Sequence, residues 1–279
     1  YLGNSKWVTV QSQSDTMLTE EVVHTPTRNY VLVCLVNTGH GTPFMSALET
    51  RELDKDLYET NAATSLGLYT RLNVGSKVST VYRYLSKVVG ARKTELRSVH
   101  ICRYPFDKFD RGRYLPSNRN WANITTTETV KSPANESYAL PSVVMSTAVT
   151  LIAASKPLEI NNFQYITYSD YNYSIFLHFA ELVKLQNNQS RVYDIRINDE
   201  KRNYFSPQYL NTTTVFTKHF VSHQFIISIS AFENSTLPPL LNAYEIYFLI
   251  NETPFTNQND GNFFYFHDMV LVSWIFHLQ

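Results

Sequence analysis

The chain has 279 residues, of which 43% are hydrophobic and 14% aromatic, enough for a packed core in one large or two ordinary domains. Lysine plus arginine and aspartate plus glutamate both number 24, so the formal charge is zero and provides no general attraction to nucleic acid or to an anionic membrane. None of the eight glycines stands in a phosphate-binding spacing, which argues against a kinase or dinucleotide site.

The first 52 residues contain short apolar runs that are typical of strands. These runs are Trp7–Val10, Glu20–Val23, Tyr30–Val36 and Phe44–Glu49. The charged stretch 51–56 follows, so we expect one domain to end near residue 52 and a linker to occupy 53–64. Cys34 lies within the third run, and we expect a buried free thiol there. A disulfide with Cys102 is the alternative.

Residues 65–250 contain enough strand candidates for an independent β-sandwich. Apolar side chains alternate along two of them, which predicts half-buried strands. The alternating residues are Tyr173, Ile175, Leu177 and Phe179 in one run, and Tyr193, Ile195 and Ile197, against Asp194 and Arg196, in the other. Two further runs, Phe225–Ala231 and Ala243–Ile250, are apolar on both faces and favour central strands. No window sustains a helical period, so the predicted class is all-β.

Two segments break this pattern. Residues 85–104 carry basic side chains and separate Tyr82-Arg83-Tyr84 from Pro105, as if the chain left the fold and re-entered it. We expect an insertion outside the fold, and a basic binding loop is the alternative. The tail 251–279 becomes apolar after residue 262, but it is shorter than the roughly 20 residues of a membrane span and contains Asp268. We therefore expect a tail that is either unpacked or laid against an apolar surface.

Possible catalytic and metal-binding groups are sparse. His219 and His223 have the spacing of a pair on one helix face, but their flanks are strand-like and no third ligand is evident. Asp107, Asp110 and Glu181 could supply the two acids of a glycosidase, yet any pair among 24 acids could be nominated. A G-x-S-x-G elbow and a calcium-binding loop are both missing. The sequence therefore predicts no catalytic residue, no metal and no cofactor.

Candidate binding and modification sites are easier to find. The stretch 163–173 is rich in aromatic residues, and Tyr168 and Tyr171 are the candidate ligand contacts, because exposed tyrosines stack on sugars and anchor peptides. Packing in the core is their alternative role. The sequence also contains N-x-[ST] sequons, which are acceptors for glycans in secreted proteins. The glycosylation candidates are Asn123, Asn135, Asn188, Asn211 and Asn234, and Asn172 and Asn251 carry further sequons.

Five blocks of the sequence are the basis of a resemblance to a known family. They are Tyr30–Phe44, Ala139–Ala148, Phe176–Leu182, Asn187–Arg191 and Asn234–Tyr247. In these blocks the chain resembles the malectin-like ectodomains of plant receptor-like kinases. Removing 85–104 would also bring together a run close to that family's R-Y-P-x-D-x-x-D-R, in which Asp110-Arg111 is expected to form a buried ion pair or to anchor a turn.

The resemblance implies an all-β fold of tandem jelly-roll β-sandwich units. Residues 1–52 would be the C-terminal part of a first unit, docked as an incomplete sheet on a complete second unit at 65–250. The linker would be 53–64, the atypical insertion 85–104, and the tail 251–279 would fall outside the family pattern. The family also often pairs the cysteine at Cys34 with an upstream partner, which is not in this sequence.

The resemblance also implies a function, namely a non-enzymatic recognition module on the extracellular face of the plasma membrane. Its ligand would be an extracellular peptide, protein or cell-wall glycan, with a co-receptor as a further partner and no nucleic acid. Because the chain begins at Tyr1 without a signal peptide and contains no kinase, we expect a fragment of a glycoprotein receptor. The alternatives are a secreted carbohydrate-active enzyme on a jelly-roll scaffold and a truncated product without function.

Overall fold

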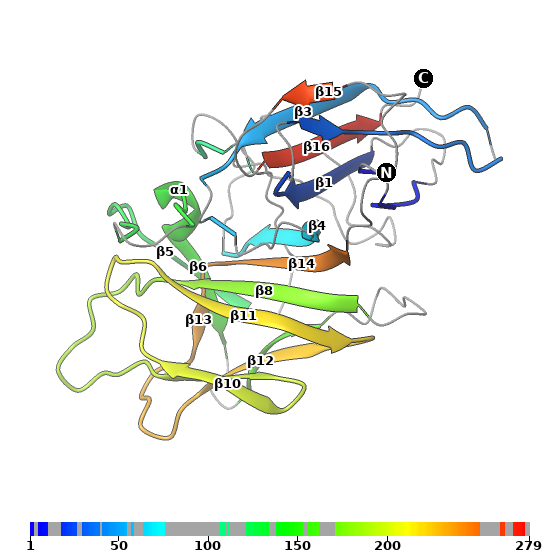
Figure 1. The fold of residues 1–279 in the computed structure, drawn as a ribbon. Coiled ribbons are helices and arrows are strands. Elements are labelled where there is room, and N and C mark those ends of the chain that lie inside the picture. The colour runs from blue at the N-terminus through cyan, green and yellow to red at the C-terminus, as the bar shows by residue number, and fades with distance from the viewer. Residues whose placement is uncertain are drawn as a thin grey trace. The chain divides into compact units, whose positions relative to one another are not determined.

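A computed structural model of the chain is shown in Figure 1. It describes residues 1–2, 5–10, 18–26, 30–39, 41–54, 57–58, 64–75, 107–109, 111, 121–133, 138–152, 156–161, 171–251, 263–265 and 270–276. Apart from one helical turn, the regular structure in these residues is antiparallel β-sheet, which confirms the predicted all-β class. No helix in the described part of the chain has the length and apolar character needed to cross a bilayer.

The elements follow in chain order. They are β1 (Leu18–His24), β2 (Tyr30–Leu32), β3 (Ala47–Glu52), β4 (Thr64–Asn73), β5 (Trp121–Thr125), α1 (Ser142–Met145), β6 (Thr147–Leu151), β7 (Leu158–Asn161), β8 (Tyr171–Phe179), β9 (Tyr193–Ile197), β10 (Glu200–Phe205), β11 (Thr213–Ser222), β12 (Ile226–Ala231), β13 (Leu240–Leu241), β14 (Ala243–Asn251), β15 (Phe263–Tyr265) and β16 (Val270–Phe276).

The chain divides into two compact units. Among the described residues, unit 1 takes those within 1–69 and 247–279, and unit 2 takes those within 70–75 and 107–246. Both boundaries fall inside strands, so β4 and β14 each contribute residues to both units. The division predicted at 1–52, 53–64, 65–250 and 251–279 refers to units of the resembled family and stays a prediction. The insertion 85–104 lies outside the described residues.

Unit 1 contains the strand order β4-β1-β16-β3, with every neighbouring pair antiparallel. Strand β16 lies between β1 and β3, so that Val272 is opposite both Val22 and Thr50. Strand β15 pairs with β2. The C-terminal segment therefore has its backbone paired at 263–265 and 270–276, and the expectation that it is unpacked is wrong for these residues.

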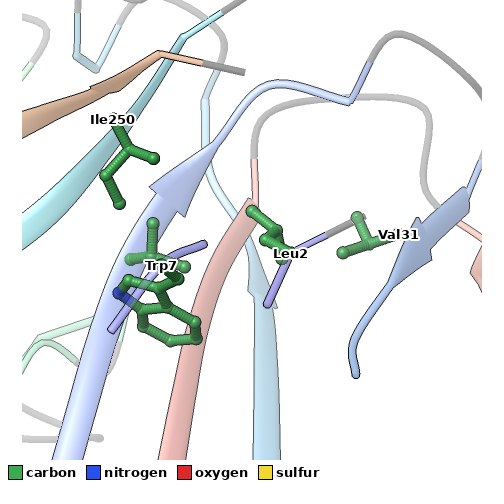
Figure 2. Packing of buried hydrophobic residues seen from close by; sticks show 5 residues of the cluster. Leu2, Trp7, Val31 and Ile250 are labelled. Carbon is green, nitrogen blue, oxygen red and sulfur yellow. The ribbon is translucent and has the colours of Figure 1, made fainter. Parts of the chain in front are cut away.

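The core of unit 1 gathers apolar residues that are distant in sequence. Leu2, Trp7, Val22, Val31 and Ile250 form one buried cluster, shown in Figure 2, where Leu2, Trp7, Val31 and Ile250 are labelled. Residues Trp7–Val10 were expected to form a strand, but this segment is irregular and contributes Trp7 to the cluster instead. A large side chain in an apolar run can be buried without a ladder of hydrogen bonds, so apolarity alone did not define a strand here.

The strand predicted at Tyr30–Val36 ends four residues early. Only Tyr30–Leu32 pair with another strand, and Leu35 and Val36 are exposed. The chain then turns at Gly39, whose backbone N–H donates a 2.8 Å hydrogen bond to Asn37 Oδ1. Cys34 carries a free thiol, as expected, but it is half-buried rather than buried.

Unit 2 contains, in addition to the three-stranded sheet β13-β6-β5, a sandwich of two sheets. One has the order β11-β8-β14-β4, the other is the four-stranded sheet β10-β9-β12-β7, and Figure 1 shows β8 and β11 facing β10 and β12. Between the sheets the ring of Phe179 lies 5.5 Å from that of Tyr193 and 4.8 Å from that of Phe205. The alternating residues predicted in β8 and β9 are all buried here. Aromatic side chains packed in this way supply much of the burial that stabilises the unit.

Strand β8 departs from its prediction on the other face. It was expected to be half-buried, but Ser174, Phe176 and His178 are buried as well. The ring of Tyr138 covers this face and lies 5.2 Å from the ring of Phe176. Burying the imidazole of His178 is unfavourable unless its nitrogen atoms find polar partners. Strand β11 provides one of them, because His178 Nδ1 is 3.0 Å from Thr214 Oγ1. Strand β8 is therefore a central strand with two covered faces.

Candidate functional site

The tyrosines proposed from the sequence as ligand contacts are not brought together by the described part of the structure. Tyr168 lies outside the described residues. Tyr171 is the first residue of β8 and pairs with Ser222 of β11. Their role as ligand contacts therefore stays a prediction.

The predicted glycosylation sites fall in different settings. Asn135 is outside the described residues, and Asn123 is exposed within β5, opposite Val149. Asn211 is half-buried, and its Nδ2 donates a 2.6 Å hydrogen bond to Gln208 Oε1. Asn188 and Asn234 are exposed in two loops that hydrogen-bond to each other. Whether any of the five carries a glycan stays a prediction.

Two of the three acids considered as hydrolase groups, Asp107 and Glu181, are enclosed in ion pairs. Asp107 is 1% exposed, and its Oδ2 accepts a 2.9 Å hydrogen bond from Arg111 Nε. Arg111 also donates to the backbone carbonyl oxygens of Tyr138 and Ala139, at 3.0 and 3.1 Å. The buried ion pair expected for Arg111 is thus made with Asp107, while Asp110 lies outside the described residues.

Glu181 is enclosed in the same way. Its Oε2 accepts a 2.7 Å hydrogen bond from Arg191 Nε, and its Oε1 accepts one from the backbone N–H of Val183. Arg191 also donates to the carbonyl oxygen of Pro238. A carboxylate that is buried and bound to its own guanidinium is committed to the fold, because breaking the pair would leave an uncompensated charge. Neither Asp107 nor Glu181 is placed to act on a substrate.

The described residues also contain a polar row that sequence reasoning missed. It crosses β4, β14, β8 and β11 through Arg71, Glu245, His178 and Thr214. Arg71 Nε lies 3.3 Å from Glu245 Oε2, and His178 Nε2 lies 3.7 Å from Glu245 Oε1, all of them buried. In the part of the chain that the structure describes, no three His, Cys, Asp or Glu side chains gather as a metal site would require. The contacts of the row connect four neighbouring strands of one sheet.

Several exposed polar and aromatic side chains lie together on the four-stranded sheet. Successive side chains of a strand point to opposite faces of the sheet. On this sheet the inner face is apolar and buried against β8, and the outer face carries polar and aromatic residues. Opposite residues in the antiparallel register share a face, which brings Tyr204, Asp194 and Ser230 into one row. The adjacent row is Lys201, Arg196, Ser228 and Glu159. We call these two rows, together with Phe232, the outer face.

A β-bulge determines which side chains of β10 reach this face. The register with β9 shifts between Lys201 and Asn203, so that Lys201 is opposite Arg196 while Tyr204 is opposite Asp194. Residues three apart on a regular strand point to opposite faces, and the extra residue in the bulge places both on the same one. This shift explains why simple alternation along the sequence did not reveal the pair.

Two aromatic rings and a cation form one end of the outer face. The rings of Tyr204 and Phe232 meet edge to face with centroids 4.6 Å apart, and Tyr204 is 47% exposed. Lys201 Nζ lies 5.7 Å from both centroids, within the range of a cation–π interaction. The rings are therefore held in place and still present a surface on which a ligand can stack.

Asp194 supplies a hydrogen-bond acceptor beside these rings. The residue is 8% exposed, and its Oδ2 accepts a 2.8 Å hydrogen bond from Arg196 Nε. Its Oδ1 is buried, and it has no hydrogen-bond partner in the described part of the structure. An unsatisfied buried acceptor costs about 1–3 kcal/mol. The outer face thus combines an aromatic surface with the cations Lys201 and Arg196.

Comparisons with known proteins agree with the resemblance seen in the sequence. The model of the malectin-like domain family matches residues 1–249. A probable LRR receptor-like serine/threonine-protein kinase, At1g05700, from Arabidopsis thaliana is 33% identical over 271 residues, which cover 94% of this chain and 29% of that protein. The LRR receptor-like serine/threonine-protein kinase IOS1 of the same plant is 35% identical over 88% of this chain and 26% of its own length. The chain therefore spans less than a third of these relatives.

Solved structures show a weaker likeness. The crystal structure of the plant receptor-like kinase FER has a TM-score of 0.48 and 17% identity over 70% of this chain and 54% of that chain. The structure of the plant peptide RALF23 in complex with FER and LLG2 has a TM-score of 0.47 and 18% identity over 74% of this chain and 58% of that chain.

Proposed function

This chain belongs to the malectin-like domain family, and from that premise we propose that it is a ligand-recognition module in the extracellular part of a plant receptor-like kinase. The observation that carries the proposal is the match of the family model over residues 1–249, together with 33% and 35% identity to two plant receptor kinases. In this proposal the signal passes to a kinase elsewhere in the full-length protein, and a co-receptor shares in ligand binding.

The buried acids support recognition rather than catalysis. A hydrolase on this scaffold would need two accessible carboxyl groups on either side of a substrate. Asp107 and Glu181 are instead buried against Arg111 and Arg191. The alternative of a carbohydrate-active enzyme therefore has no support from these two groups.

We assign the outer face as a ligand-contacting surface of this module. Its exposed ring of Tyr204 suits a ligand that has apolar surface, as sugar rings and peptides do. Lys201 and Arg196 add positive charge, and Glu159 adds negative charge at the opposite edge. The ligand class within the set of peptide, protein and cell-wall glycan is left to experiment.

The test compares two tyrosines that are exposed to the same extent. Tyr204 and Tyr209 are both 47% exposed, but only Tyr204 belongs to the outer face. The chain is screened against an array of cell-wall oligosaccharides and a library of synthetic peptides. We expect Tyr204→Ala to weaken binding of the selected ligand by about tenfold or more, as for loss of a central aromatic contact, and Tyr209→Ala to leave it unchanged.

Two results would count against the proposal. Equal binding by Tyr204→Ala and the unaltered chain would remove the outer face as the contact surface. Release of new reducing ends from any oligosaccharide by the purified chain would instead support the enzyme. Thermal melts of both variants check that any loss of binding does not follow from unfolding.

A further inference from the structure

Two sequons that are far apart in the sequence meet in unit 2. Asn188-Gln189-Ser190 lies in the loop between β8 and β9, and Asn234-Ser235-Thr236 lies in the loop between β12 and β13. Both asparagines are exposed. The contacts between the loops involve the backbone carbonyl of Asn234 and the residues that follow each asparagine, in particular the third residue of each sequon.

The hydroxyl groups of these third residues are engaged in the other loop. Ser190 Oγ donates a 2.7 Å hydrogen bond to the carbonyl oxygen of Asn234 and accepts one of 3.2 Å from the backbone N–H of Thr236. Thr236 Oγ1 accepts a 2.8 Å hydrogen bond from the backbone N–H of Ser190. Thr236 Oγ1 also lies 3.3 Å from the carbonyl oxygen of Ser190. We call this set of contacts the sequon lock.

Further hydrogen bonds extend the sequon lock on both sides. The backbone N–H groups of Thr236 and Leu237 donate to the carbonyl oxygen of Ser190, at 3.0 and 3.1 Å. Ser235 Oγ accepts a 3.0 Å hydrogen bond from the backbone N–H of Val192 and donates to the carbonyl oxygen of Leu237 at 2.8 Å. The two loops are thus held by side-chain and backbone bonds together, and the sequons have a fixed conformation.

Glycan transfer needs the groups that the sequon lock occupies. The hydroxyl of the third residue defines the acceptor sequence, so the transferring enzyme has to contact it. In the transfer, Nδ2 of asparagine forms a bond to the anomeric carbon of the first sugar. The bond from that carbon to the pyrophosphate of a lipid-linked donor breaks, the lipid pyrophosphate leaves with the electron pair, and the amide loses a proton. In the closed loops both hydroxyls already hydrogen-bond to the other loop, so an enzyme that binds Ser190 Oγ or Thr236 Oγ1 has to break those hydrogen bonds first.

We propose that Asn188 and Asn234 form a paired glycosylation site that accepts glycans only before the sequon lock closes, and that the folded chain is no longer an acceptor at either position. The proposal rests on the proposed function to the extent that the chain must enter the secretory pathway. It places two glycans at the end of the sandwich formed by the β8–β9 and β12–β13 loops.

Because one sequon is synthesised before the other, the two have unequal times in which to accept a glycan before the loops close. Ser190 precedes Thr236 by 46 residues, so the first sequon emerges during synthesis while its partner has not yet been made. The second sequon emerges when its partner is already present, and closing the loops competes with transfer. Asn188 is therefore the more fully occupied position in the secreted chain.

The first experiment uses the chain produced without glycans, purified oligosaccharyltransferase and a lipid-linked oligosaccharide donor. Glycopeptide mass spectrometry compares transfer to the folded chain and to the urea-unfolded chain after dilution. We expect transfer at Asn188 and Asn234 to be at least about tenfold slower in the folded chain, because it is limited by the population of open loops. Equal rates, or no transfer to the unfolded chain, would overturn the proposal.

The sequence offers a matched pair of variants that preserve both acceptor motifs. Ser235→Ala changes the middle residue of the second sequon and removes the hydroxyl that accepts from Val192 N. Gln189→Ala changes the middle residue of the first sequon, whose Oε1 accepts a 3.1 Å hydrogen bond from the backbone N–H of Gln186 in the same loop. Relative to their own unfolded chains, Ser235→Ala should speed transfer to the folded chain at both sites, and Gln189→Ala should not.

Expression of the three chains behind a secretion signal completes the test. We expect higher occupancy at Asn188 than at Asn234 in the unaltered chain, and a rise at Asn234 in Ser235→Ala alone. In the purified system, equal rates of glycan transfer to the folded Ser235→Ala and Gln189→Ala chains would overturn the proposal. This outcome does not depend on where the protein resides in the cell. A chain that passes the purified test but fails to enter the secretory pathway would instead contradict the proposed function.

Discussion

Buried arginines set the local structure of unit 2 at the scale of single residues. Arg111 binds the carbonyl oxygens of Tyr138 and Ala139, and Ala139 has a φ of 41°, in the left-handed region that an alanine rarely adopts. The guanidinium of Arg111 is in turn neutralised by Asp107. A chain of charge and hydrogen bonds thus holds a strained turn in place, and the acid in it serves stability.

Replacing Asp107 by Asn tests this structural role. The amide keeps the shape but leaves the buried Arg111 without a counter-charge, so we expect a loss of about 3–5 kcal/mol in the free energy of unfolding. Urea denaturation provides the measurement. The exposed residue Glu128 is the control, and Glu128→Gln should stay within about 0.5 kcal/mol of the unaltered chain. Unchanged stability of Asp107→Asn would show that the pair contributes little.

Gly75 is a second residue whose identity is determined by its surroundings. Its φ is +90°, and a Cβ at this position would lie 2.3 Å from the backbone carbonyl carbon and oxygen of Ala148. Gly39 has nearly the same φ, +88°, but a Cβ there would meet nothing within 4 Å. The two glycines therefore separate the cost of the conformation from the cost of the close approach.

We expect Gly39→Ala to cost about 1–2 kcal/mol, the price of the left-handed conformation alone. Gly75→Ala should cost more than about 3 kcal/mol, because overpacking against backbone adds to that strain. Thermal and urea unfolding of both variants measure the difference. Similar losses for the two variants would mean that Ala148 moves aside readily.

At the scale of elements, the strands with a clear period of two were predicted well and those with interruptions were not. Strands β8, β9, β12 and β14 fall where alternation or a continuous apolar run indicated them. Strand β10 was missed, because its bulge disturbs the alternation between Lys201 and Tyr204. Bulges add a residue without changing composition, so they are visible only once the partner strand is known.

Strand β16 joins two other strands of unit 1, and its removal tests how much the unit depends on it. Ending the chain at residue 262 would leave β1 and β3 with unpaired edges, since each pairs with β16. We expect a lower melting temperature and aggregation, detected by a thermal melt and size-exclusion chromatography. A chain that ends at Phe276 keeps β16 and is the control. An unchanged melt after the longer truncation would contradict the pairing.

At the scale of the whole molecule, the two units share strands β4 and β14. Unit 2 nevertheless has both sheets of its sandwich and an aromatic core between them. A sandwich with two complete faces satisfies the requirements of an independent domain. Its stability on its own is therefore a direct question for experiment.

We expect residues 65–250, with 85–104 removed, to melt in one cooperative transition. The reason is that this piece retains β4 to β14, and hence both sheets of unit 2. Differential scanning calorimetry compares the calorimetric and van't Hoff enthalpies of unfolding. A broad transition with unequal enthalpies would mean that residues 1–64 or 251–279 are needed for the fold.

The sequence by itself determined the all-β class, the family and the positions of β8, β9, β12 and β14, because side-chain alternation, apolar runs and motif spacing are local properties of the chain. Only the tertiary structure decided that Arg111 pairs with Asp107, that Tyr204 shares the outer face with Lys201, and that the loops of Asn188 and Asn234 bind each other. These features depend on a bulge, on burial and on hydrogen bonds between residues as many as 47 positions apart, as between Leu237 and Ser190. These contacts cannot be found from a local sequence pattern, because each one depends on which residues the fold brings into contact.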